Sequence, residues 1–240
     1  MWDPTIAYAV SQTARHVHQW RAEHAQAQKH ILAYLAGNAT NELIYRRQQQ
    51  LQKIGSVAVT FTDSSFADSV EDRKSHSGQL DFIYGNPVSW RSVRQSHIAT
   101  SPQHAETNAC DGGARHLVWM RKLLDDFGHP ETSASALFVD NKGLISSTLN
   151  TPRHQTNKHL DVKLFYKNEL QESKIISVRY LETSRLTADA LTKQLQRVSF
   201  VKHLRIMLGM EYLPEKDGID LIDANPVLRD FQAAGYALPT

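Results

Sequence analysis

The stretch VAVTFTDSSF, residues 57–66, is the most informative part of the sequence, because a run suited to a buried strand leads directly into Thr62 and Asp63. The stretch SALFVDN, residues 135–141, repeats this arrangement, with Asp140 closing a second apolar run. Ligand sites in sheets with parallel strands lie beyond the carboxyl ends of those strands. We therefore expect both carboxylates at one rim of a sheet.

Two further acids stand near predicted helix starts. Asp189 lies two residues after Thr187, and Glu106 lies about one turn into a helix for which Ser101 is the cap and Pro102 the first residue. Glu106 then shares a helical face with residues that should pack on a sheet, namely Cys110, Gly113 and Leu117. An acid on such an inward face is unusual without a partner.

Clustering these acids requires cations. At an effective dielectric constant near 20, two charges roughly 6 Å apart repel by about 3 kcal/mol. Hard oxygen ligands suit Mg²⁺ or Mn²⁺, and two such ions about 3.5 to 4 Å apart can stabilise the attacking and the leaving oxygen of a phosphoryl displacement. The pattern therefore predicts a two-metal site, with Asp63, Glu106, Asp140 and Asp189 as ligands.

Each acid also has a simpler interpretation. Asp63 can start a turn, Asp140 can cap a helix that begins near Asn141, and Asp189 can interact with a helix dipole. Taken singly, these structural roles are the more common ones, so the metal site depends on all four acids acting together.

Nine blocks of sequence, in a fixed order, carry a family resemblance. From about Thr5 to Met210 the chain resembles the carboxyl-terminal part of the Pol polyprotein of copia-type retrotransposons, comprising the end of reverse transcriptase and the ribonuclease H domain. The blocks are PTIAYAVSQTAR, HILAYLAG, FTDSSFADSVEDRKSHSG, PVSWRSVRQ, SPQHAETNA, FVDNKGLI, TNKHLDVKLFYKNEL, TADALTKQL and LGM. The resemblance implies that the four metal ligands of the family correspond to Asp63, Glu106, Asp140 and Asp189.

The sequence departs from the family pattern beside two of these ligands. The family usually has Asp-Ala-Asp-Trp where this chain has Asp63, Ser64, Ser65 and Phe66. It usually has Ser-Thr-Glu-Ala-Glu-Tyr where this chain has QHAET, residues 103–107. The inferred ligands are retained, but two nearby acids and two aromatic residues are lost.

The resemblance implies an α/β, ribonuclease H-like fold, with a five-stranded mixed sheet flanked by helices and preceded by a small helical appendage. The expected parts are residues 1–50, a remnant of the reverse transcriptase thumb or connection; 55–209, the ribonuclease H-like domain; and 210–240, an acidic and loosely attached tail. Because the polymerase's catalytic segment lies upstream in the family, we do not expect this chain to polymerise DNA.

Local patterns place the individual elements. Helices are predicted at 4–18, 21–36, 102–127, 141–149, 158–172 and 187–208, the last broken near Gln196. Ile6, Val10, Thr13 and Val17 should share one face of the first helix, and Gln28, Ile31, Leu32 and Leu35 one face of the second. A short strand is expected from Glu42 to Arg46. The sheet strands are predicted at 56–63, 78–84, 87–92, 135–140 and 175–181, with a hairpin turn at Gly85, Asn86 and Pro87.

Composition and charge agree with this interpretation. The chain has 240 residues, 41% of them hydrophobic, and one cysteine, Cys110, so an internal disulfide is excluded and a buried thiol is expected. Residues 211–240 hold six acids against Lys216 and Arg229, a net charge of −4, which leaves +6 for the rest of a chain whose total is +2. A modestly basic body suits a nucleic-acid backbone.

The resemblance implies a metal-dependent endonuclease that uses two Mg²⁺ or Mn²⁺ ions to hydrolyse the RNA strand of an RNA–DNA hybrid during reverse transcription. The expected partners are that hybrid and the upstream reverse transcriptase segment of the same polyprotein, with no membrane. The sequence lacks a signal-peptide pattern and a long apolar stretch. We therefore expect an intracellular location, cytoplasmic in a virus-like particle or nuclear.

Candidate contacts to nucleic acid come from hydroxyl and basic residues. A 2′-hydroxyl contact would select RNA, and lysine or arginine would hold phosphates. His159, close to His154, could shuttle a proton, although a surface or capping role is more common. Trp90 and Trp119 are expected in the core. The candidates are Ser64, Ser65, Arg73, Lys74, Ser75, Lys158 and Lys163, with Arg91, Arg94 and Lys167 as further basic residues.

Two other classes of protein fit part of the pattern. A catalytically inactive, domesticated remnant would bind nucleic acid or a protein partner without cleaving it, and the altered residues beside the ligands favour this interpretation. An integrase-like DNA strand transferase of the same fold would bring a zinc module of His and Cys, against which the single cysteine argues.

Overall fold

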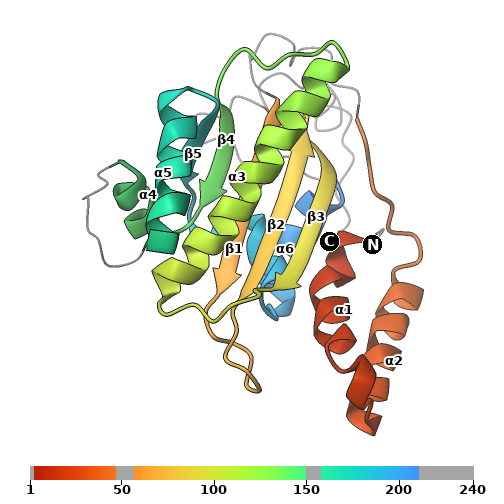
Figure 1. Cartoon of the computed structure of the whole chain (residues 1–240). Helices are drawn as coiled ribbons and strands as arrows, with labels where there is room; N and C mark the ends of the chain where they lie inside the picture. The colour runs from red at the N-terminus through yellow and green to blue at the C-terminus, as the bar shows by residue number, and fades with distance from the viewer. Residues whose placement is uncertain (1–2, 47–56, 150–157, 211–240) are drawn as a thin grey trace.

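The computed structural model describes residues 3–46, 57–149 and 158–210. Its centre is a sheet of five strands that correspond to the five predicted ones (Figure 1). The strands contribute apolar side chains to the core, among them Val59, Phe61, Leu80, Phe82, Leu137, Phe138, Ile176 and Val178. The strands are β1 (Ala58–Ser65), β2 (His76–Ile83), β3 (Asn86–Arg94), β4 (Ser135–Val139) and β5 (Ile176–Tyr180).

The sheet is mixed, as predicted. Its order is β3-β2-β1-β4-β5, in which the pairs β3–β2 and β2–β1 are antiparallel and the pairs β1–β4 and β4–β5 are parallel. The antiparallel strands β1, β2 and β3 follow one another directly in the chain. The parallel strands need helical crossovers, and helices lie between β3 and β4 and between β4 and β5. This topology confirms the ribonuclease H-like α/β fold class.

The predicted hairpin between β2 and β3 is confirmed, but its turn begins one residue earlier than predicted, because Asn86 and Pro87 already belong to β3. Its two turn residues, Tyr84 and Gly85, have φ angles of 51° and 71°. Positive φ at both central positions is the type I′ geometry, whose twist matches that of the flanking strands. The turn therefore fixes the register in which Ile83 pairs with Asn86.

Helices cover both faces of the sheet (Figure 1). One face is covered by α3 (Pro102–Asp126), with α4 (Lys142–Leu149) and α5 (Lys158–Glu172) beside it. The other is covered by η5 (Thr187–Leu191), next to α6 (Arg197–Met207), so the predicted interruption near Gln196 is confirmed. Within the core, the ring of Phe61 stacks on Phe138 at 5.1 Å and meets Phe82 edge-on at 5.6 Å. A further single turn, η4 (Thr183–Arg185), follows β5.

Two short helices precede the sheet. The first consists of η1 (Pro4–Ile6), α1 (Ala7–Ala14) and η2 (Val17–Gln19), and α1 packs against β3. The second, α2 (Ala22–Gly37), contains no buried residue. The predicted apolar faces were therefore wrong in part, because the side chains of Val17 and Leu32 are 61% and 58% exposed.

The strand expected from Glu42 to Arg46 was wrong. This segment has no regular secondary structure. Hydrogen bonds attach it to other parts of the chain. The Ile44 amide donates to the Leu208 carbonyl at 2.8 Å, and the Arg46 amide donates to Oδ1 of Asn86 at 2.7 Å. A strand needs a continuous ladder, and these two bonds reach different elements.

The expectation for the tryptophans was half correct. Trp90 is partly buried against the core, whereas Trp119 is 53% exposed and stacks on His116 with ring centroids 5.1 Å apart. The expected tail, residues 211–240, lies outside the described residues, and the boundaries of the expected parts remain predictions. Within the described part of the chain, no helix has the length and apolar character needed to span a membrane.

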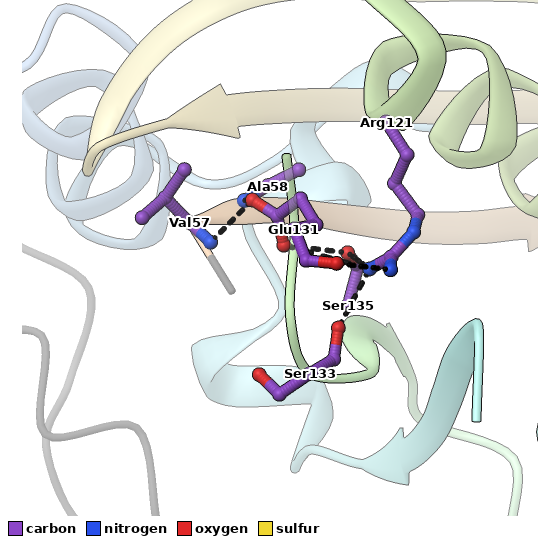
Figure 2. Close-up of polar contacts among 6 residues, drawn as sticks. All are labelled: Val57, Ala58, Arg121, Glu131, Ser133 and Ser135. Atoms are coloured by element: carbon purple, nitrogen blue, oxygen red, sulfur yellow. Dashed lines mark hydrogen bonds and ion pairs between the residues drawn. The ribbon is translucent and has the colours of Figure 1, made fainter. Parts of the chain in front are cut away.

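A buried ion pair ties three elements together at the end of the sheet where β1 begins (Figure 2). Oε1 of Glu131 accepts hydrogen bonds from the amides of Val57 and Ala58, at 2.7 and 3.1 Å. Arg121, from α3, lies 3.5 Å from Oε2 of Glu131 and donates to Oγ of Ser135 at 2.7 Å. The Glu131 side chain is 2% exposed, so α3, β1 and β4 share one desolvated charge pair.

Replacing Glu131 by Gln should lower the free energy of unfolding by about 2 kcal/mol, because the partly buried charge of Arg121 then loses its ionic partner. Urea denaturation measures the change. Glu169→Gln, at an exposed position of α5, is the matched control and should change stability by less than about 0.5 kcal/mol. Equal stabilities for the two variants would contradict this role of the ion pair.

Candidate metal-ion site

Asp63 and Asp140 lie at one rim of the sheet, as the sequence predicted. Asp63 lies near the carboxyl end of β1, and Asp140 directly follows β4. Because β1 and β4 are parallel and Phe61 pairs with Phe138, the two acids occupy corresponding positions two residues further along. The parallel pairing thus places both carboxylates at the same end of neighbouring strands.

Glu106 reaches the same rim from α3. The Ser101 hydroxyl accepts the amide of His104 at 3.1 Å and Pro102 is the first helical residue, so the helix starts where the sequence predicted. The predicted inward face, with Cys110, Gly113 and Leu117, is buried.

Gly113 sets how closely α3 approaches the sheet. A Cβ atom at this position would collide with Cγ2 of Thr62 and would lie 3.2 Å from a methyl group of Leu137. Only glycine permits this spacing. Glu106 is two turns earlier on the same helix, so the contact at Gly113 brings it to the level of Asp63.

The three acids converge. Asp63, Glu106 and Asp140 each offer one carboxylate oxygen, and these three oxygens lie within 4.8 Å of one another. Asp63 and Glu106 are buried, whereas Asp140 is partly exposed. Ser64 Oγ donates to Oε1 of Glu106 at 2.8 Å, and Thr183 Oγ1 donates to Oδ2 of Asp140 at 2.7 Å.

Asp189 comes from the opposite face of the sheet and is not a member of that group of three. It is 4% exposed and lies in η5, which packs tightly on β2 at Gly78, where a Cβ atom would lie 2.7 Å from the carbonyl oxygen of Ala188. Gly78 pairs with Asp63 across the ladder. The negative charge of Asp189 is close enough to Asp63 to raise its pKa.

Burial and mutual repulsion disfavour the charged forms of these acids. Burial, followed by the charges of Asp189 and Asp140, raises the pKa of Asp63 to about 7 against the opposing effects of the Thr192 hydroxyl and Lys193. Burial and the charge of Asp63 raise the pKa of Glu106 to about 8. At neutral pH the site therefore attracts protons or other cations.

Two residues that contact the acids, Thr192 and Lys193, were not predicted as site residues from the sequence. Oγ1 of Thr192 donates a hydrogen bond to Oδ2 of Asp63, and Nζ of Lys193 forms an ion pair with Oδ1 of Asp189. Burial alone would lower the pKa of Lys193, but the hydrogen bond and charge of Asp189, with the charges of Asp63 and Asp140, raise it overall. The signal available in the sequence was the spacing of four residues between Asp189 and Lys193.

The predicted hydroxyl contacts differ in accessibility. Ser64 is partly exposed beside Glu106, and the Ser65 hydroxyl is buried without a hydrogen-bond partner among the described residues. Ser75 is fully buried and accepts the amide of Ala67 at 3.1 Å, so its hydroxyl is turned to the chain itself. We therefore omit Ser75 from the candidate interface.

The predicted basic residues also differ in exposure and in ion pairing. Arg73 is exposed, whereas Lys74 lies 3.9 Å and Arg94 2.8 Å from Asp72. Lys167 was wrong as a surface cation, because it is fully buried. His154 lies outside the described residues, and the side chains of Lys158 and His159 are outside the described part.

A groove of about 850 Å³ is lined by residues of β2, β3, α3 and α5, including Gly78, which pairs with Asp63 in the sheet. Its lining is basic. The sequence did not point to Arg115, or to the side-chain amides of Gln95 and Asn108, as part of this surface. The charged lining residues are Arg91, Arg94, Arg115 and Lys163.

Hydrogen bonds order the floor of this groove. Nζ of Lys163 donates to Oδ1 of Asn108 at 2.6 Å, and the Asn108 amide donates to Oε1 of Gln95 at 3.0 Å. Nε2 of Gln95 donates in turn to Ser77 Oγ at 2.8 Å. Ser77 pairs with Ser64 in β1, so this chain of bonds connects the basic groove with the acidic rim.

The chain is similar in sequence to Pol polyproteins of plant transposons. The chain is 28% identical over 197 residues, 82% of its length, to the "Retrovirus-related Pol polyprotein from transposon TNT 1-94" of Nicotiana tabacum, and it spans 14% of that protein. It is 32% identical over 117 residues to the "Secreted RxLR effector protein 161" of Plasmopara viticola, covering 49% of this chain and 79% of that one. No family model matches.

Among solved structures, LC11-RNase H1 in complex with an RNA/DNA hybrid aligns with a TM-score of 0.43 and 13% identity. The alignment covers 56% of this chain and 93% of that one. A likeness of this size adds nothing to the strand order already described.

The raised pKa values predict how stability depends on pH. A carboxyl group whose pKa is higher in the folded than in the unfolded protein stabilises the fold at low pH and loses this contribution as the pH rises through the folded pKa. In a chelator, the melting temperature should therefore fall by about 5 °C or more between pH 6 and pH 9. Calorimetric or fluorescence melting curves measure it.

Asp63→Asn and Glu106→Gln provide the control for this profile. Each removes one group of the coupled pair, so the melting temperature should fall less over the same pH range, and millimolar Mg²⁺ should have a similar effect in the unmodified protein. A profile that the two substitutions leave unchanged would show that other groups cause the decline.

Proposed function

We propose that this chain, which is homologous to part of the Pol polyproteins of copia-type retrotransposons, is a metal-dependent endonuclease that hydrolyses the RNA strand of RNA–DNA hybrids. The observation that carries this proposal is the convergence of Asp63, Glu106 and Asp140, with three carboxylate oxygens within 4.8 Å. Asp189 is proposed as the fourth ligand.

The donor set fits hard divalent cations. All the converging atoms are carboxylate oxygens, and Oε2 of Glu106 is buried without a hydrogen-bond partner among the described residues. An oxygen in that position loses its bound water on folding, and a cation would compensate for that loss. Mg²⁺ or Mn²⁺ suits this set, because both prefer oxygen ligands, and the sequence predicts two such ions.

When bound, such ions supply electrostatic stabilisation of the pentacoordinate phosphate and lower the pKa of a bound water. The residues of the chain hold the site in position. Asp63 is fixed by Thr192 and Glu106 by Ser64, and the packing at Gly113 keeps the two acids together. Thr183 orients Asp140 from the turn after β5. Preorganised ligands of this kind need no rearrangement during the reaction.

The basic groove is the proposed binding site for the strand that is not cut. Arg91, Arg115 and Lys163 line it and can hold phosphates, while Asn108 and Gln95 offer polar contacts at the floor. The groove adjoins the acidic rim through Ser77 and Gly78, so one duplex can contact both. Ser64 remains a candidate for the 2′-hydroxyl contact that selects RNA, whereas Ser65 is dropped because its hydroxyl is buried.

The upstream reverse transcriptase segment of a Pol polyprotein is the proposed protein partner. The first two helices support this, because α2 has no buried residue and Trp20 and Leu32 expose 44% and 58% of their surface. Exposed apolar side chains on one small appendage fit a contact with another protein better than a contact with water.

The proposal predicts cleavage of a labelled RNA–DNA hybrid in Mg²⁺ or Mn²⁺. Asp63→Asn and Glu106→Gln should each lower kcat by about a hundredfold or more, since each removes a charge that holds the ions. Asp126→Asn, at an exposed position near the end of α3, should leave kcat unchanged. Circular dichroism checks that each variant is folded.

The same assay separates the other candidate functions. A remnant that binds nucleic acid without cleaving it is favoured by the engagement of Asp63 with Thr192 and of Asp189 with Lys193. Hybrid binding without any cleavage in either metal would establish that function and reject the endonuclease. Cleavage of duplex DNA but not of the hybrid would indicate a strand transferase.

Substitutions in the groove test the binding mode. Arg91→Gln and Lys163→Gln should each weaken hybrid binding and reduce the slope of log K against log salt by about 1, because one phosphate contact is lost. Lys29→Gln, on the exposed side of α2, should change neither quantity. Fluorescence anisotropy at several salt concentrations measures both. Unchanged slopes in the groove variants would place the duplex elsewhere.

A further inference from the structure

Lys193 introduces a positive charge among the acids of the site. It follows Asp189 by four residues, and its Nζ atom contacts Oδ1 of that acid. Its charge also acts on Asp63 and Asp140. One ammonium group thus interacts with three of the four proposed ligands, although the proposed chemistry assigns it no role.

The two partners of this ion pair differ in freedom. The Asp189 side chain is 6% exposed, and η5 holds its backbone through the hydrogen bonds from the Asp189 amide to Leu186 and from the Thr192 amide to Asp189. The Lys193 side chain is 46% exposed and ends a flexible four-carbon stem. If the pair separates, the lysine moves and the acid stays.

A divalent cation and this ammonium compete for the same atom. Oδ1 of Asp189 is the atom that contacts Nζ, so an ion coordinated by that oxygen must displace the lysine. The hydroxyl of Thr192 differs in this respect, because its contacts are Oδ2 of Asp63 and the backbone carbonyl of Asp189, and Oδ1 of Asp63 is left for coordination. Displacement therefore concerns Lys193 alone of these two residues.

We propose that Lys193 is a built-in counter-ion of the acidic site, which competes with the divalent cation for Asp189 and so sets the affinity of the site for that ion. This inference rests on the proposed function. Lys193 reduces repulsion among the acids when ion concentrations are low, and moves toward solvent when an ion enters. It is a positioning residue, since it acts through Asp189.

Lys193→Met tests the inference, because methionine keeps an unbranched apolar stem and removes the charge. Isothermal titration of the full chain with Mg²⁺ and with Mn²⁺ should show binding about tenfold tighter than in the unmodified protein, the effect expected for one partly exposed charge near the ligands. In a chelator the variant should melt at a lower temperature than the unmodified protein at pH 8. The rise in melting temperature on adding Mg²⁺ should therefore be larger.

Lys122→Met is the matched control, as Lys122 is exposed on α3 and outside the groove lining. It should leave ion affinity and both melting temperatures unchanged. Lys193→Arg keeps the charge and should bind ions with an affinity closer to that of the unmodified protein than to that of Lys193→Met.

The outcomes distinguish this inference from the proposed function. If the unmodified chain binds neither ion at millimolar concentration, the proposed function fails and the inference with it. If the unmodified chain binds ions and Lys193→Met binds them equally or more weakly, only the counter-ion role is overturned. A loss of cleavage with unchanged ion affinity would also overturn it, because Lys193 would then act on the nucleic acid.

Discussion

The repulsion between the buried carboxylates of Asp63 and Glu106 is the constraint on which the remaining structure depends, because nothing in their own chemistry brings them together. Apolar packing does so. The stacked rings of Phe61 and Phe138 hold β1 beside β4, and the missing side chain at Gly113 lets α3 lie directly on β1. The far end of α3 is fixed by the ion pair of Arg121 with Glu131 (Figure 2).

Hydroxyl groups compensate only part of that repulsion. Ser64, Thr183 and Thr192 each donate one hydrogen bond to one of the acids, and none of them carries a charge. Burial has the largest effect on both Asp63 and Glu106, and the hydrogen bonds from Thr192 and Ser64 offset it only in part. This is why the pKa values of Asp63 and Glu106 stay raised, and why the site favours cations.

The basic groove and the acidic rim have opposite charge, and hydrogen bonds connect the elements that carry them. Lys163, Asn108 and Gln95 connect α5, α3 and the segment after β3 by hydrogen bonds, and Ser77 joins this chain to the strand beside β1. A polyanion held by the basic side is thereby directed toward acids that need cations before they can approach a phosphate. In the proposed function, nucleic-acid binding and ion binding are therefore separate contributions of neighbouring surfaces.

Much of the frame could be predicted from local sequence. Alternation and turn residues placed the five strands, Ser101 and Pro102 placed the start of α3, and the acids closing β1 and β4 followed from where the apolar runs end. These features depend on neighbours within a few residues, and a single sequence contains that information. The family resemblance supplied the joint role of the acids, which periodicity alone left open.

Contacts between distant segments were decided only in three dimensions. Thr192 and Asp63 are 129 residues apart, and their hydrogen bond exists because η5 crosses β2 at Gly78. The sequence likewise gave no means to foresee that Trp119 is exposed, that Ser75 is buried, or that residues 42–46 form no strand. What the sequence by itself determined was the chemistry available at each position and the local conformation. Which side chains meet was set by the packing of the sheet and its helices, since burial depends on every segment that covers a residue.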